Sequence, residues 1–156
     1  VPKFNDCYNG WRSLVLIIEL KKHKNFASVV VFVDKDNKIL LLKRPNRKNL
    51  TYAGKWGFVG GGSEDYETPK EAAIRETAEE TALKVLPEDL KLIDKIESPD
   101  KRVVYVFVCN KYEGIVRTNS VKEEHDDYDW VAVHELGEYD MPDNSMPLIK
   151  KALSVL

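Results

Sequence analysis

The chain has 156 residues, a length that suits one domain with its own apolar core. Hydrophobic residues make up 43% of it and charged residues 32%, which is typical of a soluble globular protein rather than a disordered or fibrous one. The 24 basic and 26 acidic residues nearly balance, so the composition lacks the basic excess that indicates general nucleic-acid binding. We expect a single domain over residues 1–156, in which 1–26 is an N-terminal extension that carries a strand.

The cysteines and the apolar runs bear on the compartment. Cys7 and Cys109 form neither a disulfide framework nor a pair with metal-ligand spacing. Cys109 ends an apolar run, so it is expected to be a buried thiol. Apolar stretches such as Leu14 to Ile18 are far too short to span a bilayer. The expectation is a cytoplasmic protein with no membrane partner.

The first half of the chain predicts strands, because its apolar runs are short and rich in β-branched residues. The second and third runs flank Asp34-Lys35-Asp36-Asn37, a sequence typical of a hairpin turn. A polar loop from Pro45 to Lys55 follows, and the fourth strand ends in Gly60-Gly61-Gly62. The predicted strands are residues 13–20, 27–33, 38–44 and 56–59.

A helix is predicted from Thr68 to about Ala82. Thr68 supplies an N-cap, Pro69 occupies the first helical position, and Glu71 completes a capping box. Small or apolar side chains spaced four apart predict a narrow buried stripe along this helix. These side chains are Ile74, Ala78 and Ala82.

The second half mixes strands with one more helix. Residues 90–97 and 102–110 predict a strand pair joined by a turn at Ser98-Pro99-Asp100. Another strand is expected from Trp130 to Val133, and a final helix over 146–154, capped by Asn144 or Ser145. Strands and helices in no regular alternation indicate an α+β domain.

Three glutamates of the first predicted helix share one face. Glu76, Glu79 and Glu80 stand at i, i+3 and i+4, a spacing at which like charges destabilise a helix by roughly 0.2–0.5 kcal/mol per pair. From charge alone, a solvated acidic surface is the favoured interpretation. A glycine-rich turn lies just before the helix, however, and lets backbone approach a ligand closely. This context favours a site for hard cations such as Mg²⁺ or Mn²⁺, which prefer carboxylate oxygen.

The segment Gly61 to Leu83 resembles the Nudix box: Gly, five residues, Glu, seven residues, Arg-Glu, an aliphatic, any residue, Glu-Glu, any residue, Gly, an aliphatic. The departures are Thr77 at the first aliphatic position, Ala82 where glycine is usual, and Val59 where proline often precedes the glycines. None of them removes a carboxylate. The matching positions are Gly61, Glu67, Arg75, Glu76, Glu79, Glu80 and Leu83.

The resemblance extends over roughly residues 27–135 and implies the Nudix fold, a mixed β-sheet sandwiched between α-helices. It also implies metal-dependent hydrolysis of a pyrophosphate bond in a nucleoside diphosphate linked to another moiety. Candidate substrates are ADP-ribose, a dinucleoside polyphosphate, a nucleoside triphosphate, a sugar nucleotide and capped RNA. Apart from capped RNA, no nucleic-acid partner is expected.

The resemblance also assigns roles. Mg²⁺ or Mn²⁺ is expected on Glu76, Glu79, Glu80 and Gly60. Glu80, Glu124 and Glu76 are the catalytic candidates, and the general base is left open between Glu80 and the loop residue Glu124, with Glu123 a weaker third. Glu67 and Arg75 are expected to be structural. Arg44 is a candidate phosphate contact, because a guanidinium matches phosphate oxygens in a bidentate geometry. Gly61 and Tyr66 complete the expected substrate contacts.

Two alternatives stay open. A Nudix-fold protein that binds nucleotides or a partner without turnover would share most of these features, although the complete set of Glu76, Glu79 and Glu80 argues against it. The strand at 13–20 either pairs with the edge of a second copy, forming a homodimer, or completes the monomer's own sheet.

Overall fold

The computed structural model describes residues 25–118 and 127–156. The predicted strand at 13–20 and the residues Cys7, Glu123 and Glu124 lie outside these ranges. Within them, no helix has the length and apolar character needed to cross a bilayer. Strands and helices mix without regular alternation, so the α+β prediction is confirmed.

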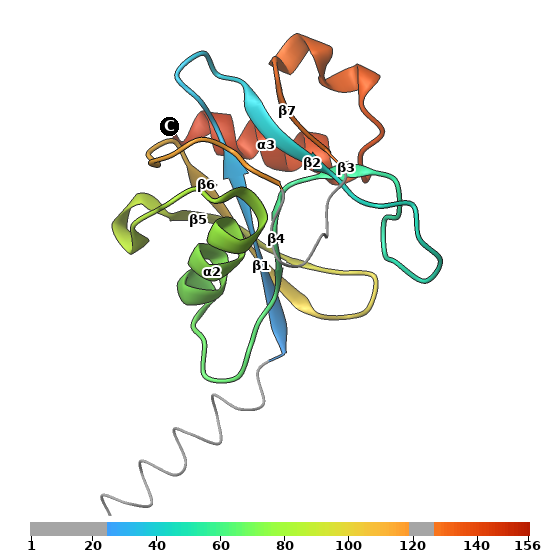
Figure 1. Ribbon diagram of the computed structural model, residues 1–156, viewed down its shortest axis with the longest axis vertical. Coiled ribbons are helices and arrows are strands. Elements are labelled where there is room, and N and C mark those ends of the chain that lie inside the picture. The colour runs from blue at the N-terminus through green and yellow to red at the C-terminus, as the bar shows by residue number, and fades with distance from the viewer. Residues whose placement is uncertain (1–24, 119–126) are drawn as a thin grey trace, which may run out of the picture.

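Seven strands of the described ranges form two sheets (Figure 1). The larger sheet has the order β4-β1-β6-β5, with β1 parallel to β6 and the other pairs antiparallel. The smaller sheet has the order β3-β2-β7 and is antiparallel throughout. The strand bounds are β1 Phe26–Phe32, β2 Ile39–Lys43, β3 Trp56–Gly57, β4 Val59–Gly62, β5 Lys91–Glu97, β6 Val103–Cys109 and β7 Asp127–Val131.

The predicted hairpin is only partly right. The turn forms, since the Asp34 amide donates to the Lys38 carbonyl and the Asn37 amide to the Asp34 carbonyl. Beyond it, β1 and β2 share a single bridge, Val33 to Ile39, and then enter different sheets. The reason is that β1 already pairs with β4 along one edge and with β6 along the other. The predicted strand at 56–59 likewise divides into β3 and β4, one in each sheet.

Side chains of β1 alternate between two cores. Val31 and Val33 pack with Leu148 and Ile149 of α3, the helix Ser145–Ser154. Val30 and Phe32 face the other way and share a core with residues of α2, the helix Pro69–Thr81, and of the segment after it. The two helices therefore cover opposite faces of the larger sheet, which is the predicted sandwich (Figure 1).

The second half follows the sequence closely. β5 and β6 form the expected antiparallel pair with its turn at 98–100, and α3 begins one residue before the predicted start, after Asn144. The predicted strand at 130–133 is displaced: β7 ends at Val131, and Val133 opens a 3₁₀ segment, Val133–Glu138. A second 3₁₀ turn, Pro87–Asp89, precedes β5. Cys109 is fully buried, as expected.

Candidate active site

A local signal in the sequence fixes the start of α2, but its end lacks the usual glycine. The Thr68 side chain accepts from the Glu71 amide at 3.2 Å, and the Glu71 carboxylate accepts in turn from the Thr68 amide at 3.4 Å. This is the predicted capping box, with Pro69 in the first turn. The helix ends at Ala82, which adopts the left-handed conformation with φ 62°. A residue with a Cβ therefore holds the conformation that usually selects glycine.

The inward face of α2 is polar, which corrects the predicted apolar stripe. Ala78 and Ala82 are exposed and Ile74 is only half-buried. Glu76 and Glu80 lie inside instead, with 4% and 2% of their surface exposed, so the solvated acidic face is also wrong for these two. The full buried set is Ala72, Ala73, Glu76, Thr77, Glu80 and Thr81.

Both buried carboxylates lie against the glycines of β4. The Gly60 amide donates to Glu80 Oε2 at 2.9 Å. A Cβ added to Gly61 would stand 2.8 Å from Glu76 Cδ, so this carboxylate rests directly on the strand. At Gly60, where φ is +152°, a Cβ would stand 2.1 Å from the carbonyl oxygen of Ser28. The close approach of helix and strand therefore requires residues without side chains.

Arg75 links the box together. Its Nε and Nη2 donate to the two oxygens of Glu67 at 2.5 and 3.1 Å, and Nη2 also donates to the Gly62 carbonyl at 2.9 Å. Its Nη1 donates to Glu76 at 2.7 Å and to Glu79 at 3.2 Å. The hydrogen bond to Glu67 is the largest cause that raises the pKa of Arg75 further, so the guanidinium stays charged. Arg75 and Glu67 thus tie the glycine loop to the helix.

The donor set fits a hard divalent cation. Glu76 and Glu80 present buried oxygen donors beside Gly60 and Gly61, and buried carboxylates are stabilised by pairing or by metal coordination. In the described ranges, no three acidic, histidine or cysteine side chains are gathered as a ready ligand cluster. The geometry explains this, because the Arg75 guanidinium bridges Glu76 and Glu79. To hold a cation, Glu76 and Glu79 would have to turn away from Arg75, whereas the Glu80 carboxylate already faces the strand.

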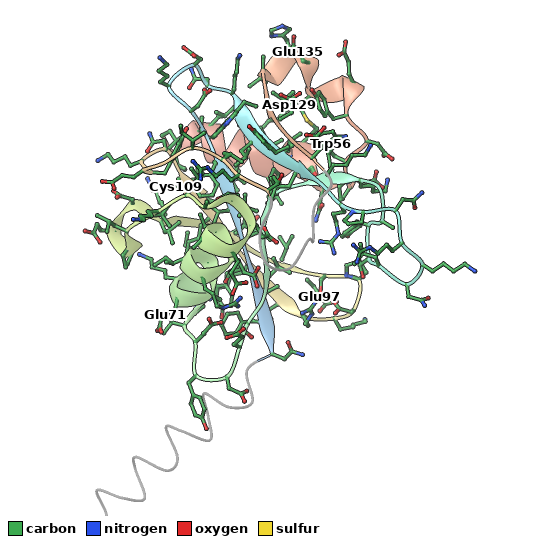
Figure 2. All side chains as sticks on the ribbon, viewed as in Figure 1. Trp56, Glu71, Glu97, Cys109, Asp129 and Glu135 are labelled. Carbon is green, nitrogen blue, oxygen red and sulfur yellow. The ribbon has the colours of Figure 1, made fainter. Side chains whose placement is uncertain are left out.

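A cavity of about 550 Å³ opens beside the glycine strand, within the range of sites that bind small molecules. Glu76, Glu80 and all three glycines of β4 line it. Trp56 of β3 and Glu97 at the end of β5, both labelled in Figure 2, belong to its wall. The rest of the wall is largely apolar where it meets the sheet and α3, through Ala27, Val29, Phe58, Ile96, Val104 and Leu148.

Two of the three expected substrate contacts line the cavity and the third does not. Arg44 and Gly61 line the cavity, and the Nε of Arg44 is buried with no hydrogen-bond partner among the described residues. Tyr66 lies in the loop before α2, is 47% exposed and does not line the cavity. Glu124 is outside the described residues. The sequence argument missed Arg102, which lines the cavity from the β5–β6 hairpin, and its only signal was a position beside a predicted turn.

Two curated relatives share much of the chain. An ADP-ribose pyrophosphatase from Methanocaldococcus jannaschii is 34% identical over 120 residues, covering 71% of this chain and 68% of the relative. A dihydroneopterin triphosphate diphosphatase from Haemophilus influenzae is 29% identical over 160 residues, covering 91% of this chain and 96% of the relative. The two names differ in the compound that is cleaved.

A solved structure of MutT, from a study of the Aliivibrio salmonicida and Vibrio cholerae proteins, has the same fold. It matches with a TM-score of 0.69 at 21% identity, covering 85% of this chain and 98% of that one. The family model of the NUDIX domain matches residues 22–152, which include the glycine strand, the acidic helix and the whole cavity wall. The chain therefore belongs to the Nudix family.

Proposed function

We propose that this protein is a metal-dependent pyrophosphohydrolase that cleaves the diphosphate bond of a nucleotide derivative. One observation carries the proposal: two buried carboxylates, Glu76 and Glu80, reach the edge of a cavity of nucleotide-accommodating size through a strand of glycines. Both relatives are named for splitting phosphate anhydrides, and they support the same class of reaction.

In this proposal Glu76, Glu79 and Glu80 hold Mg²⁺ or Mn²⁺ together with the backbone of Gly60. Such an ion, when bound, neutralises the diphosphate and lowers the pKa of a water molecule attached to it. The Gly60 amide fixes the direction of the Glu80 carboxylate, and Arg75 limits where Glu76 and Glu79 can turn. These contacts place the charges before the substrate arrives.

Arg44 serves as the phosphate contact on the opposite wall. Its buried Nε needs an acceptor, and a buried donor left without one costs roughly 1–3 kcal/mol. If the Arg44 side chain turns toward the cavity, a phosphate oxygen there would satisfy Nε with a charge-assisted hydrogen bond. The apolar wall formed by residues such as Phe58 and Leu148 suits the nucleoside or another uncharged part of the substrate.

A substrate panel with Mg²⁺ and with Mn²⁺ tests the proposal. It contains ADP-ribose, dihydroneopterin triphosphate, ordinary and oxidised nucleoside triphosphates, a dinucleoside polyphosphate, a sugar nucleotide and capped RNA. Glu80→Gln should lower kcat/KM by about 10²-fold or more, the effect of removing an essential acid–base or ligand group. Glu71→Gln is the matched control, because Glu71 is an exposed glutamate of the same helix whose amide analogue can still accept from the cap.

Two further results decide the details. Glu79→Gln tests the third proposed ligand, and Glu124→Gln compared with Glu80→Gln separates the two candidates for the general base, because the base variant recovers rate as the pH rises. If the wild type hydrolyses none of the panel yet binds nucleotides, the non-catalytic binding module replaces the enzyme. If Glu80→Gln and Glu79→Gln both keep wild-type rates, the metal assignment is wrong.

A further inference from the structure

The glycine strand β4 separates two charged groups. Successive positions of a strand point to opposite faces, and here Gly61 faces Glu76 whereas Gly62 faces Arg102. A Cβ added to Gly62 would stand 3.1 Å from Arg102 Nη1. β4 is an edge strand, so no further strand covers its outer side within the described sheet. Glu76, the glycines of β4 and Arg102 line the same cavity.

The register of the sheet explains how Arg102 reaches β4. Ala27 of β1 pairs with Gly62 on one side and with Val104 on the other, so these three residues form a row across the sheet. Arg102 lies two residues before Val104 and therefore projects to the same face. Gly62 has no side chain, and the long Arg102 side chain reaches over it.

The β5–β6 hairpin holds this side chain in place. Arg102 Nε donates to Asp100 Oδ2 at 2.7 Å, and the Ser98 hydroxyl donates to the other oxygen of Asp100. The Arg102 amide donates to Ser98 Oγ at 3.1 Å, which closes the turn. Hydrogen bonding by Ser98, followed by the charge of Arg102, lowers the pKa of Asp100, so this carboxylate stays ionised at neutral pH.

A purely structural role accounts poorly for the guanidinium. The Ser98 amide donates to the Arg102 carbonyl and the Arg102 amide donates to Ser98 Oγ, so the turn closes without the arginine head group. The Arg102–Asp100 pair is 36% and 54% exposed, and ion pairs of that exposure contribute little stability. Asp100 occupies the Nε edge, whereas Nη1 lies over Gly62. Arg102 lines the same cavity as Glu76 and Glu80.

We propose that Arg102 is a substrate-binding residue that grips a phosphoryl group of the diphosphate across the glycine edge from Glu76 and Glu80. This inference rests on the proposed function and adds one recognition element to the same site. The substrate chain would cross the edge of β4, with a phosphate held by the Arg102 guanidinium through charge-assisted hydrogen bonds. Arg102 thus selects for the diphosphate that every candidate substrate shares, and it does not select for a particular base.

Calorimetric titration with non-hydrolysable nucleotides tests the assignment. The probes are the α,β-methylene analogues of ADP, GDP, CDP and UDP, with Mg²⁺ in excess, against the full chain. Arg102→Ala should weaken all of the analogues that bind by the same factor, about 10- to 100-fold, as expected for the loss of charge-assisted hydrogen bonds. Arg102→Lys should bind more tightly than Arg102→Ala but less tightly than the wild type, because lysine keeps the charge and lacks the planar guanidinium that donates two parallel hydrogen bonds.

Lys101→Ala is the matched control. Lys101 is the next residue of the same hairpin, carries the same charge, is mostly exposed and does not line the cavity, so its removal should leave affinity unchanged. Melting temperatures of all variants should agree with that of the wild type. If Arg102→Ala proves unstable, Arg102→Gln, which keeps the length and lacks the charge, carries the same prediction.

The outcomes are distinct. Wild-type affinity in Arg102→Ala, or a loss for one base only, overturns the inference, and so does a wild type that binds none of the four probes. The titrations need no turnover. A wild type that binds the analogues in an Arg102-dependent way but hydrolyses no substrate therefore overturns the hydrolase proposal alone.

Discussion

Alanine substitutions at two neighbouring glycines of β4 should affect different properties: Gly60→Ala should lower stability, and Gly61→Ala should lower activity. Gly60→Ala places a Cβ 2.1 Å from the Ser28 carbonyl oxygen and 2.6 Å from Val29 Cα, both backbone atoms of the neighbouring strand. The backbone at φ +152° is also one that L-residues rarely adopt, at a cost of roughly 1–3 kcal/mol. Relief requires β4 to move away from β1, which weakens the ladder by about 1 kcal/mol per hydrogen bond.

Gly61→Ala differs because its new Cβ meets only a side chain. The atoms of the Glu76 carboxyl group lie at 2.8, 2.8 and 3.0 Å from the added Cβ, and they must retreat by about 0.6 Å to reach ordinary contact. No backbone atom is among these contacts, and Gly→Ala also reduces the entropy of the unfolded chain by about 0.4–1 kcal/mol. We therefore expect stability within about 1 kcal/mol of the wild type.

The two variants should separate in a paired measurement. Thermal unfolding followed by circular dichroism should show Gly60→Ala melting lower by roughly 6–12 °C, from about 3 kcal/mol at 2–4 °C per kcal/mol. Gly61→Ala should melt near the wild type but lose roughly ten- to a hundredfold in kcat/KM, since displacements of this size misplace reacting groups. Gly137→Ala, where an added Cβ meets nothing within 4 Å, should change neither quantity. Full activity in Gly61→Ala would refute the claim that Glu76 works from its position on this strand.

Three further changes follow from single contacts, each read by unfolding or titration. Ala82→Gly should raise the free energy of unfolding by about 1 kcal/mol, because Ala82 holds a left-handed conformation that costs an L-residue roughly that much; an unchanged melting curve contradicts it. Thr77→Val should also stabilise, by about 1 kcal/mol, since Thr77 Oγ1 is buried with no hydrogen-bond partner among the described residues; a lower melting temperature counts against this. The hydrogen bond from the Tyr139 hydroxyl to Asp129 raises the pKa of Tyr139 to about 12. The stability that this hydrogen bond contributes is therefore complete below pH 10 and is lost as the pH rises through 12. In an ultraviolet pH titration, Asp129→Asn should move one tyrosine to a lower pKa. Titration curves of the variant and the wild type that superimpose would contradict the hydrogen bond between Tyr139 and Asp129.

Local signals predicted local structure well. The helix start at Thr68, the turn at Asp34 to Asn37 and the β5–β6 pair were all readable, because each depends on residues close together in the chain. The assignment of strands to sheets was not readable. β1 takes β6 as a parallel neighbour from more than seventy residues away, and that pairing displaces β2 into the other sheet.

The prediction of an apolar inward face on α2 was wrong, and the reason is informative. Periodicity arguments place apolar side chains inside, and Ile74, Ala78 and Ala82 had the right spacing. The face that turns inward instead carries Glu76 and Glu80, because only that face meets the glycines of β4. Departures of this kind, in which burial contradicts hydrophobicity, are expected where function shapes the structure. The family resemblance identified these glutamates as site residues, whereas charge and spacing on an isolated helix predicted that they lie on the solvated surface.

The polar inner face also determines what holds α2 in place. Ala72 and Ala73 offer little apolar area, so hydrophobic burial alone cannot anchor the helix over the sheet. Half-buried Ile74 adds apolar packing against the core. Polar contacts complete the attachment: the Ser28 hydroxyl donates to the Pro69 carbonyl and the Gly60 amide to Glu80, and Arg75 donates to Glu67 and to the Gly62 carbonyl. Arg75 also orients Glu76 and Glu79, so the contacts that fix the helix are the ones that aim the carboxylates. If Glu76 and Glu79 turned from Arg75 to hold the proposed cation, Glu67 and the Gly62 carbonyl would still retain the guanidinium, so the glycine loop would stay tied to the helix.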